Sequence, residues 1–224
     1  FGDDVEVVCE DIVHEDPADA ICQAAKDAAA DCVVVGTHGR TGPKRWIFGS
    51  VAEQVVRHAL TSVLVARAAG DQPPRRILCP IDFSDTSLAA LRRARSWCRH
   101  FDAALTVCHV VEIPSTVATV PFELAGSITA ARATSDLPAR RDAARERLDA
   151  LQHDELGDVE TVACEVLTGH SADTAICREI ERGGYDLTIL GSAGSTGLLD
   201  RLLGSVSERV VRESPTSVLV VRTP

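Results

Sequence analysis

Short apolar runs alternate with amphipathic segments along most of this chain. From residue 76 onward, apolar runs predict buried strands at 76–81, 104–111, 160–166, 187–190 and 218–222. Between them, apolar residues at helical spacing predict helices at 85–100, 137–152, 171–182 and 205–213. A long loop is expected at 113–135. Short apolar strands that alternate with helices indicate an α/β fold, a doubly wound parallel sheet of five strands.

An internal repeat divides the chain. Residues 5–67 align with 160–222 without a gap, and roughly 24 of 63 positions are identical. The segment before 160 has no counterpart upstream. We therefore expect the C-terminal half of a first unit at 1–69, a linker at 70–75 and a complete second unit at 76–224.

The half unit predicts an open sheet edge, because it lacks the strands that are central in the complete unit. The strands of a partner, or of a longer chain, would cover that edge. The chain begins at Phe1 and contains no Met, so we expect that it lacks its natural beginning.

Both copies of the repeat carry one glycine pattern. Its members are Gly36, Gly39, Gly49, Ser50 and Val51 in the first copy, and Gly191, Gly194, Gly204, Ser205 and Val206 in the second. Glycines between a strand and a helix let backbone N–H groups approach a phosphate, and the helix N-terminus favours the anion. Because both copies have the same spacing between these residues, the pattern predicts phosphate binding. The alternative is two capping boxes, formed by Ser50 with Glu53 and by Ser205 with Glu208, which need no ligand.

Asp82 follows the strand at 76–81 directly. A carboxylate at that end of a first strand can accept hydrogen bonds from a ribose or an adenine. The alternative role is a cap for the next helix, which Ser84 can fill instead. Asp82 is therefore a candidate ligand-binding residue.

Composition narrows the classes of function. The net charge of −10 argues against a nucleic-acid partner, because a duplex requires a broad basic surface. The 8 cysteines show no metal-ligand spacing and several lie in apolar runs, among them Cys32, Cys79 and Cys108. Buried reduced thiols and the absence of any long apolar run predict a cytoplasmic protein without a membrane span.

Together these motifs resemble the universal stress proteins, of the ATP-binding subclass, arranged in tandem with a truncated first unit. Both glycine patterns match that family, as do Pro80-Ile81-Asp82-Phe83-Ser84 and His109-Val110. The resemblance implies the related fold of adenine-nucleotide α-hydrolases. It also implies that Pro80, Asp82 and Val110 frame the adenine and ribose.

On the same resemblance, further residues complete a site in the second unit. Leu190, Gly191 and Gly194 would line the ribose and phosphates, and Gly204, Ser205 and Val206 would hold the phosphates. The first unit would keep a partial site, made of Val35, Gly36, Gly39, Gly49, Ser50 and Val51.

One departure affects the phosphate side. The family often carries a His and a basic residue in the glycine loop, as in His38 and Arg40 of the first copy. The second copy has Ala193 and Ser195 instead. A cation is therefore missing where the site is otherwise complete, so Mg²⁺ or an Arg from a neighbour would matter more.

The resemblance implies a regulatory module of the stress response that binds ATP, ADP or AMP. No general base is evident, so we expect slow ATP hydrolysis at most. The strands at 63–67 and 218–222 are the family's pairing edge, and here they would associate the two units in a dimer-like core. One alternative is a protein-interaction dimer that has lost nucleotide binding. A second is an adenylating enzyme, which the glycine-free segment 82–85 disfavours.

Other residues receive structural interpretations. His109 is expected to be a strand-end or core histidine, and residues 140–147 the solvated face of a helix. Residues 46–48 are expected to pack between the units.

Overall fold

The computed structural model describes residues 7–37, 48–67, 72–113, 136–193 and 203–223. The strands are β1 (Cys32–Gly36), β2 (Ser62–Ala66), β3 (Arg76–Pro80), β4 (Ala104–Glu112), β5 (Val162–Gly169), β6 (Leu187–Gly191) and β7 (Ser217–Val221). The helices are α1 (Pro17–Asp27), α2 (Ser50–His58), α3 (Asp85–Phe101), α5 (Leu137–Glu155), α6 (Ala172–Gly183) and α7 (Ser205–Glu213). The expected long loop and residues 46–47 lie outside the described residues, whereas Phe48 packs against the core.

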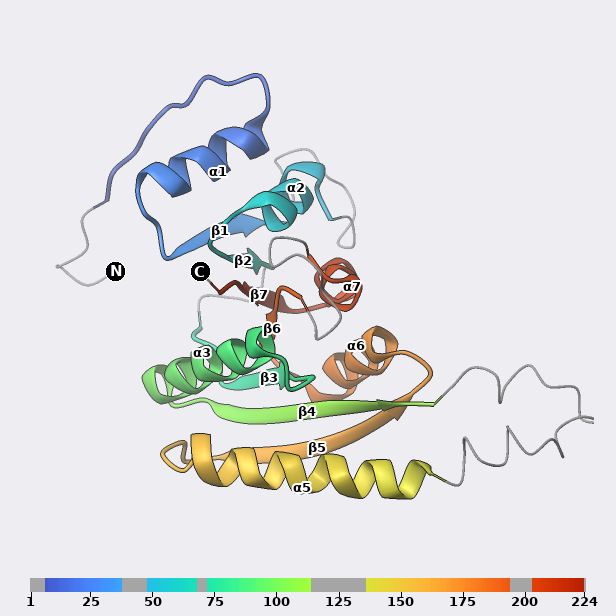
Figure 1. Cartoon of the computed structure of the whole chain (residues 1–224). Coiled ribbons are helices and arrows are strands. Elements are labelled where there is room, and N and C mark those ends of the chain that lie inside the picture. The colour runs from blue at the N-terminus through green and yellow to red at the C-terminus, as the bar shows by residue number, and fades with distance from the viewer. Residues whose placement is uncertain (1–6, 38–47, 68–71, 114–135, 194–202, 224) are drawn as a thin grey trace, which may run out of the picture.

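One sheet holds all these strands, in the order β1-β2-β7-β6-β3-β4-β5 (Figure 1). The five strands of the second unit are mutually parallel, and their order reverses between β3 and β6, as in a doubly wound fold. The predicted fold class is confirmed. The sheet has seven strands rather than five because β1 and β2, from the half unit, extend it beyond β7.

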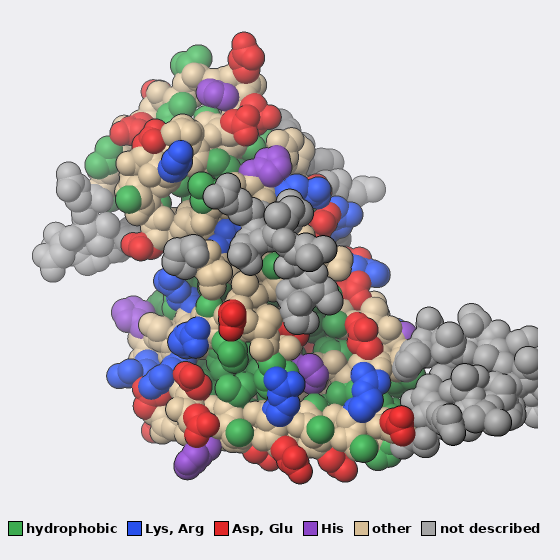
Figure 2. Space-filling view, viewed as in Figure 1, with side chains coloured by type: hydrophobic (Ala, Val, Ile, Leu, Met, Phe, Trp, Pro, Cys, Tyr) green, Lys and Arg blue, Asp and Glu red, His purple; other side chains and the backbone are tan. Residues whose placement is uncertain are grey.

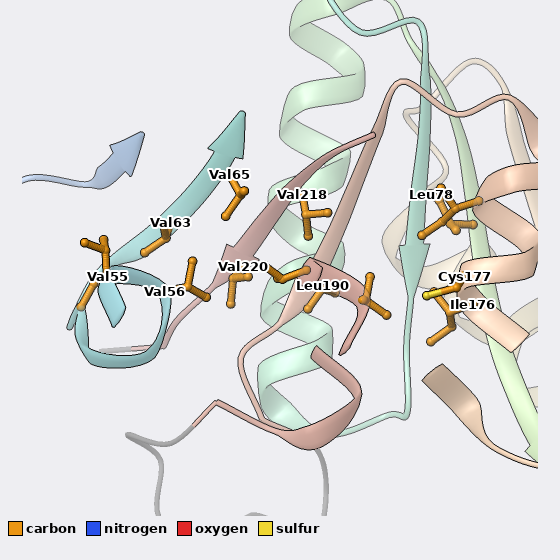
Figure 3. Packing of buried hydrophobic residues seen from close by; sticks show 14 of the residues in the cluster. Val55, Val56, Val63, Val65, Leu78, Ile176, Cys177, Leu190, Val218 and Val220 are labelled. Atoms are coloured by element: carbon orange, nitrogen blue, oxygen red, sulfur yellow. The ribbon is translucent and has the colours of Figure 1, made fainter. Parts of the chain in front are cut away.

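Helices cover the sheet on two faces (Figure 1). On one face, α1, α2, α6 and α7 enclose a core that includes Val63, Val65, Val218 and Val220, whose side chains lie next to one another in Figure 3. On the other face, α3 and α5 enclose a second core. Nearly all these core residues are aliphatic, as the low aromatic content requires.

The helix that follows β3 begins and ends at residues suited to these positions. The Ser84 side chain accepts a hydrogen bond from the Ser87 N–H, so Ser84 is the N-cap of α3, as predicted. Asp102 ends the helix in the left-handed region, with φ 53°. Between these residues Ala90, Leu91 and Ala94 are buried, and these small side chains bring α3 close to the sheet.

The two units meet at an antiparallel pair of strands. Val63 faces Val220, Leu64 faces Leu219 and Val65 faces Val218. Leu64 and Leu219 occupy the same position of the repeat, so a local two-fold axis passes between them. The expected association of the two strands is observed within the chain, and each has a neighbour on both sides.

Polar contacts around this axis follow the same symmetry. Arg67 Nη2 donates to the Val211 carbonyl at 2.7 Å, and Arg222 Nη2 donates to the Val56 carbonyl at 2.8 Å. Each guanidinium thus binds carbonyls of the other unit's helix. Burial lowers the pKa of both guanidinium groups from their ordinary value.

Four charged side chains from α2 and α7 form an ion-pair square. Arg57 lies 3.3 Å from Glu53 and 2.9 Å from Glu208, and Arg212 lies 3.2 Å from Glu53 and 3.3 Å from Glu208. Glu53 and Glu208 are equivalent in the repeat, as are Arg57 and Arg212. All four side chains are about one third to one half exposed, so each pair stabilises modestly.

The half unit leaves part of the sheet uncovered, as the sequence predicted. Within the described part of the chain, β1 is the end strand, and Val34 is 62% exposed. Ile189, at the equivalent position of β6, is completely buried.

Some of the cysteines are buried and others are not. Cys79, Cys98, Cys108 and Cys177 are buried and reduced, as expected, whereas Cys9 is exposed. Cys32 was expected to be buried but is half-buried, because it lies on the end strand.

Charge is mixed on the molecular surface. On the face in Figure 2, acidic and basic side chains are interspersed, with hydrophobic side chains visible between α3 and α5. No helix in the described ranges has the length and apolarity that a membrane span needs.

The repeat offers a matched test of core packing. Replacing Ile189→Ala removes a buried side chain between β6 and α3 and should lower the free energy of unfolding by about 2–5 kcal/mol. The equivalent change Val34→Ala acts on an exposed side chain and should cost about 0.5 kcal/mol or less. Urea unfolding followed by circular dichroism measures both, and equal losses would contradict the described burial.

Candidate functional site

A cavity of about 470 Å³ opens at the carboxyl ends of β3, β4 and β6. It therefore lies where the strand order reverses, the place at which open α/β sheets bind ligands. Helices α3, α5, α6 and α7 contribute further walls. The lining residues are Pro80, Ile81, Asp82, Ser87, Cys108, His109, Val110, Glu112, Arg140, Ala172, Ile176, Leu190, Gly191, Ala193, Gly204, Ser205, Val206 and Ser207.

Most residues of the predicted second-unit site meet in this cavity. Its walls include Pro80, Asp82, Val110, Leu190, Gly191, Gly204, Ser205 and Val206. Gly194, the remaining member, lies outside the described residues, as does Ser195. Residues far apart in the sequence are thus brought to one hollow by the strand order.

The start of α7 forms one end of the cavity. Gly204 is the N-cap, with φ −68° and ψ 151°, and no side chain caps the helix. The N–H groups of Ser205 and Val206, in the first turn, have no acceptor within the helix. The Gly204 N–H itself donates to the Ser192 carbonyl at 2.7 Å. Two predicted phosphate donors are therefore available, and the third is already bonded.

The capping-box interpretation is wrong in both copies. It requires Ser205 or Ser50 at the N-cap, whereas Gly204 and Gly49 occupy that position and each serine begins its helix. The serine hydroxyl therefore makes no cap, and the first turn of each helix stays open to an anion.

The packing of α3 against the end of β6 requires a glycine at position 191. A Cβ added there would lie 2.9 Å from the carbonyl carbon and oxygen of Thr86, and 3.0 Å from the Ser87 nitrogen. These are backbone atoms at the start of α3, which cannot move aside cheaply. The absence of a side chain thus lets α3 approach the end of β6. The Ser207 hydroxyl also donates to the Gly191 carbonyl, at 2.7 Å.

Asp82 is exposed at the mouth of the cavity, and its Oδ1 accepts the Ser84 N–H at 3.1 Å. The next residue, Phe83, has φ 64°, a left-handed conformation that costs a non-glycine residue about 1–2 kcal/mol. The Arg147 guanidinium lies 3.7 Å above the Phe83 ring, and the His109 ring lies 4.8 Å away. This tight turn fixes the direction of the Asp82 side chain.

His109 has the structural role that its position on a strand predicted. Its Nδ1 donates to the Ile81 carbonyl at 2.9 Å, since a carbonyl can only accept. The bond ties β4 to the turn after β3. Because His109 also lines the cavity, it supports the wall next to Asp82.

Arg140 lines the cavity, a placement that the sequence analysis did not predict. It is exposed, as expected for a solvated helix face, but it lines the cavity from the first turns of α5. Its Nη1 donates to the Glu112 carbonyl at 2.9 Å, and the Glu112 carboxylate accepts the Ala172 N–H at 2.9 Å. The Arg140–Glu112 bond holds a cation at the β4 end of the cavity.

The first copy keeps the backbone geometry of the helix start. The Gly49 N–H donates to the Thr37 carbonyl at 3.0 Å, as Gly204 does to Ser192, and Gly49 is the N-cap of α2. Val35, Gly36, Ser50 and Val51 lie around this turn, but none lines the cavity described above. Gly39, His38 and Arg40 lie outside the described residues. The walls that β3 and β4 supply in the second unit have no described counterpart here.

Cys108 lies in the cavity wall without reactive character. Burial raises the pKa of its thiol well above the ordinary value, so the thiol stays protonated at neutral pH. Among the described residues, no group of three or more His, Cys, Asp or Glu is placed to hold a metal ion.

Known proteins resemble this chain along nearly its whole length. The model of the universal stress protein family matches residues 2–67 and 74–222. The universal stress protein MJ0531 of Methanocaldococcus jannaschii is 32% identical over 157 residues, which cover 69% of this chain and 86% of that protein. A second protein of that organism, MJ0577, is 27% identical over 154 residues, 66% of this chain and 94% of the relative.

Solved structures share the fold. The match to the structure of MJ0577 covers 67% of this chain and 96% of the MJ0577 chain, with a TM-score of 0.56 and 26% identity. The match to the structure of a universal stress protein of Archaeoglobus fulgidus covers 92% of this chain and 66% of that protein's chain, with a TM-score of 0.62 and 22% identity. The second similarity concerns the fold alone.

The packing role of Gly191 is testable without a ligand. Gly191→Ala should lower the free energy of unfolding by about 1–3 kcal/mol, because the new Cβ collides with the backbone of α3. Gly157→Ala is the control, since its Cβ would meet only the His153 carbonyl oxygen at 3.7 Å. Urea unfolding of both variants should separate them, and an unchanged midpoint for Gly191→Ala would refute the close approach.

Proposed function

The chain belongs to the universal stress protein family, and we propose that its complete unit binds an adenine nucleotide, ATP first among them. The observation that carries this proposal is the cavity at the strand-order reversal. It gathers an open helix N-terminus, glycine backbone and the Asp82 carboxylate around one hollow large enough for a nucleotide.

The phosphates would lie at the α7 end. The N–H groups of Ser205 and Val206 point from an uncapped first turn, and the positive end of the helix dipole favours an anion there. Mg²⁺ is usually held by nucleotide phosphates with few protein ligands, so we include it as the counter-ion of the nucleotide.

The base and ribose would lie at the β3–β4 end. Pro80 and Val110 provide apolar walls, and Asp82 provides an acceptor for ribose hydroxyls. Arg140 lies at this end, because it is bonded to Glu112 at the end of β4. A planar guanidinium can stack on a purine, so Arg140 would hold the base rather than the phosphates.

The site favours binding over rapid catalysis. Asp82 accepts a hydrogen bond from the Ser84 N–H and His109 donates one to the Ile81 carbonyl, so both side chains stabilise the turn after β3. We therefore propose a regulatory module of the cytoplasmic stress response, with slow hydrolysis at most. Its nucleotide occupancy would report on the state of the cell.

The direct test is calorimetric titration with ATP, ADP and AMP in the presence of Mg²⁺, together with melting curves. A ligand that binds the native state must raise the melting temperature. Mass spectrometry of ligand released from purified protein identifies the bound nucleotide. A chain that shows neither heat nor a melting shift with millimolar nucleotide is instead the nucleotide-free interaction protein.

A charge at the start of α7 should separate binding from folding. Ser205→Asp places a carboxylate beside the phosphates and should weaken ATP binding at least about tenfold. The same carboxylate favours the helix N-terminus, so the unliganded melting temperature should not fall. Ser50→Asp is the matched control in the first copy, and it should leave the ATP affinity unchanged. Equal affinities for all three proteins would exclude the α7 turn as the phosphate site.

Substitutions of two neighbouring arginines test the proposed position of the adenine base. Arg140→Ala should weaken ATP, ADP and AMP by one common factor of about 2 to 30, the strength of a cation–π contact. Arg141→Ala, which removes the adjacent exposed charge outside the cavity, should change none of the affinities. A loss that grows with the number of phosphates would place Arg140 on the phosphates instead.

A further inference from the structure

The end of β6 is tied to the start of α7 by two hydrogen bonds. The Gly191 carbonyl accepts the Ser207 hydroxyl, and the Ser192 carbonyl accepts the Gly204 N–H, each at 2.7 Å. Gly204 is the N-cap of α7. The position of residues 191 and 192 therefore helps to fix the turn that carries the proposed phosphate donors.

A third bond in this region comes from α3. The Thr86 hydroxyl donates to the carbonyl of Ala193, a residue that lines the cavity. The backbone of the same threonine lies against Gly191, where an added Cβ would be 2.9 Å from the Thr86 carbonyl carbon and oxygen. Thr86 thus contacts both the first and the last residue of the segment 191–193.

The cap of α3 does not depend on the Thr86 hydroxyl. The side chain of Ser84 accepts the Ser87 N–H and caps this helix. A hydroxyl has one proton and a carbonyl oxygen can only accept, so Thr86 donates its proton to Ala193. The main contact of this hydroxyl is therefore with the segment after β6 rather than with its own helix.

Polar contacts also join Thr86 to the other end of the cavity. The Ser84 hydroxyl lies 3.1 Å from Thr86 Oγ1 and donates to Asp82 Oδ1. Asp82 is the proposed acceptor for ribose hydroxyls. Thr86 therefore stands between the carboxylate that would bind the ribose and the segment that leads to the phosphate donors.

We propose that Thr86 is a positioning residue of the nucleotide site, an inference that rests on the proposed function. Its hydroxyl holds the segment 191–193 against α3, and this segment in turn holds the start of α7. The N–H groups of Ser205 and Val206 are thereby kept in place for the phosphates. Because the effect acts on the phosphates, Thr86 favours nucleotides over the nucleoside adenosine.

Two variants of Thr86 test the positioning role without a ligand. Thr86→Val removes the hydroxyl and keeps the branched shape, whereas Thr86→Ser keeps the hydroxyl. Thr86→Val should speed hydrogen exchange of the Gly204 amide about 2- to 12-fold, which corresponds to the loss of one hydrogen bond. Thr86→Ser should exchange like the original chain. The amides of β4 are the reference, because a general loss of stability would speed their exchange as well.

Calorimetric titration with ATP and adenosine tests the effect on binding. Thr86→Val should weaken ATP binding about 2- to 12-fold and adenosine binding less than about twofold, whereas Thr86→Ser should bind both like the original chain. Thr174→Val is the matched control. It removes a threonine hydroxyl from the first turn of α6, where that hydroxyl bonds to Ser171 at 3.0 Å and does not line the cavity. It should change neither affinity.

Two results would overturn the positioning role. One is unchanged exchange of the Gly204 amide in Thr86→Val, and the other is an equal loss of ATP and adenosine binding. An original chain that binds no nucleotide would refute the proposed function itself, and the exchange comparison would still decide whether Thr86 holds the segment 191–193.

Discussion

The antiparallel contact between β2 and β7 is the constraint on which the rest of the architecture depends. It joins strands from the two copies of the repeat, and Leu64 faces its own equivalent, Leu219. A hydrogen-bonded seam between equivalent strands imposes a two-fold relation on everything attached to them. The helices α2 and α7 therefore meet as symmetric neighbours, and Arg67 and Arg222 each bind the carbonyls of the opposite helix.

The β2–β7 contact also separates the cavity of the second unit from the strands of the half unit. The cavity lies at β3, β4 and β6, on the side of the second unit away from β2, and no described residue of the first unit lines it. The half unit instead covers the outer side of β7, which would otherwise be an exposed sheet edge. A partial repeat can thus stabilise a complete one without sharing its site.

Periodicity and turn residues predicted most of the fold. The helices and strands of the second unit lie near their expected positions, and Ser84 caps α3 as its sequence indicates. The five strands of the second unit are confirmed. That β1 and β2 extend the same sheet depends on the pairing of β2 with β7, a long-range contact that the family resemblance implied and that local patterns do not specify.

The sequence predicted the site residues whose role depends on local backbone geometry. It did not predict those whose position depends on packing between distant segments. Glycine spacing brought Gly191 and Gly204 to attention, yet the close approach of Thr86 to Gly191 comes from a distant segment. The S-x-x-E pattern suggested a cap, but the glycine before it occupies that place. Arg140 resembles its exposed neighbours in sequence, and only the placement of α5 beside β4 distinguishes it.

The ion-pair square links the two copies of the repeat energetically. Glu53 contacts Arg57 and Arg212, and Glu208 contacts the same two arginines. A charge reversal in either copy would thus place like charges together across the axis as well as within its own helix. A substitution at any of these four positions therefore changes ion pairs in both copies, so the energetic effect of a change in one copy depends on the residues of the other.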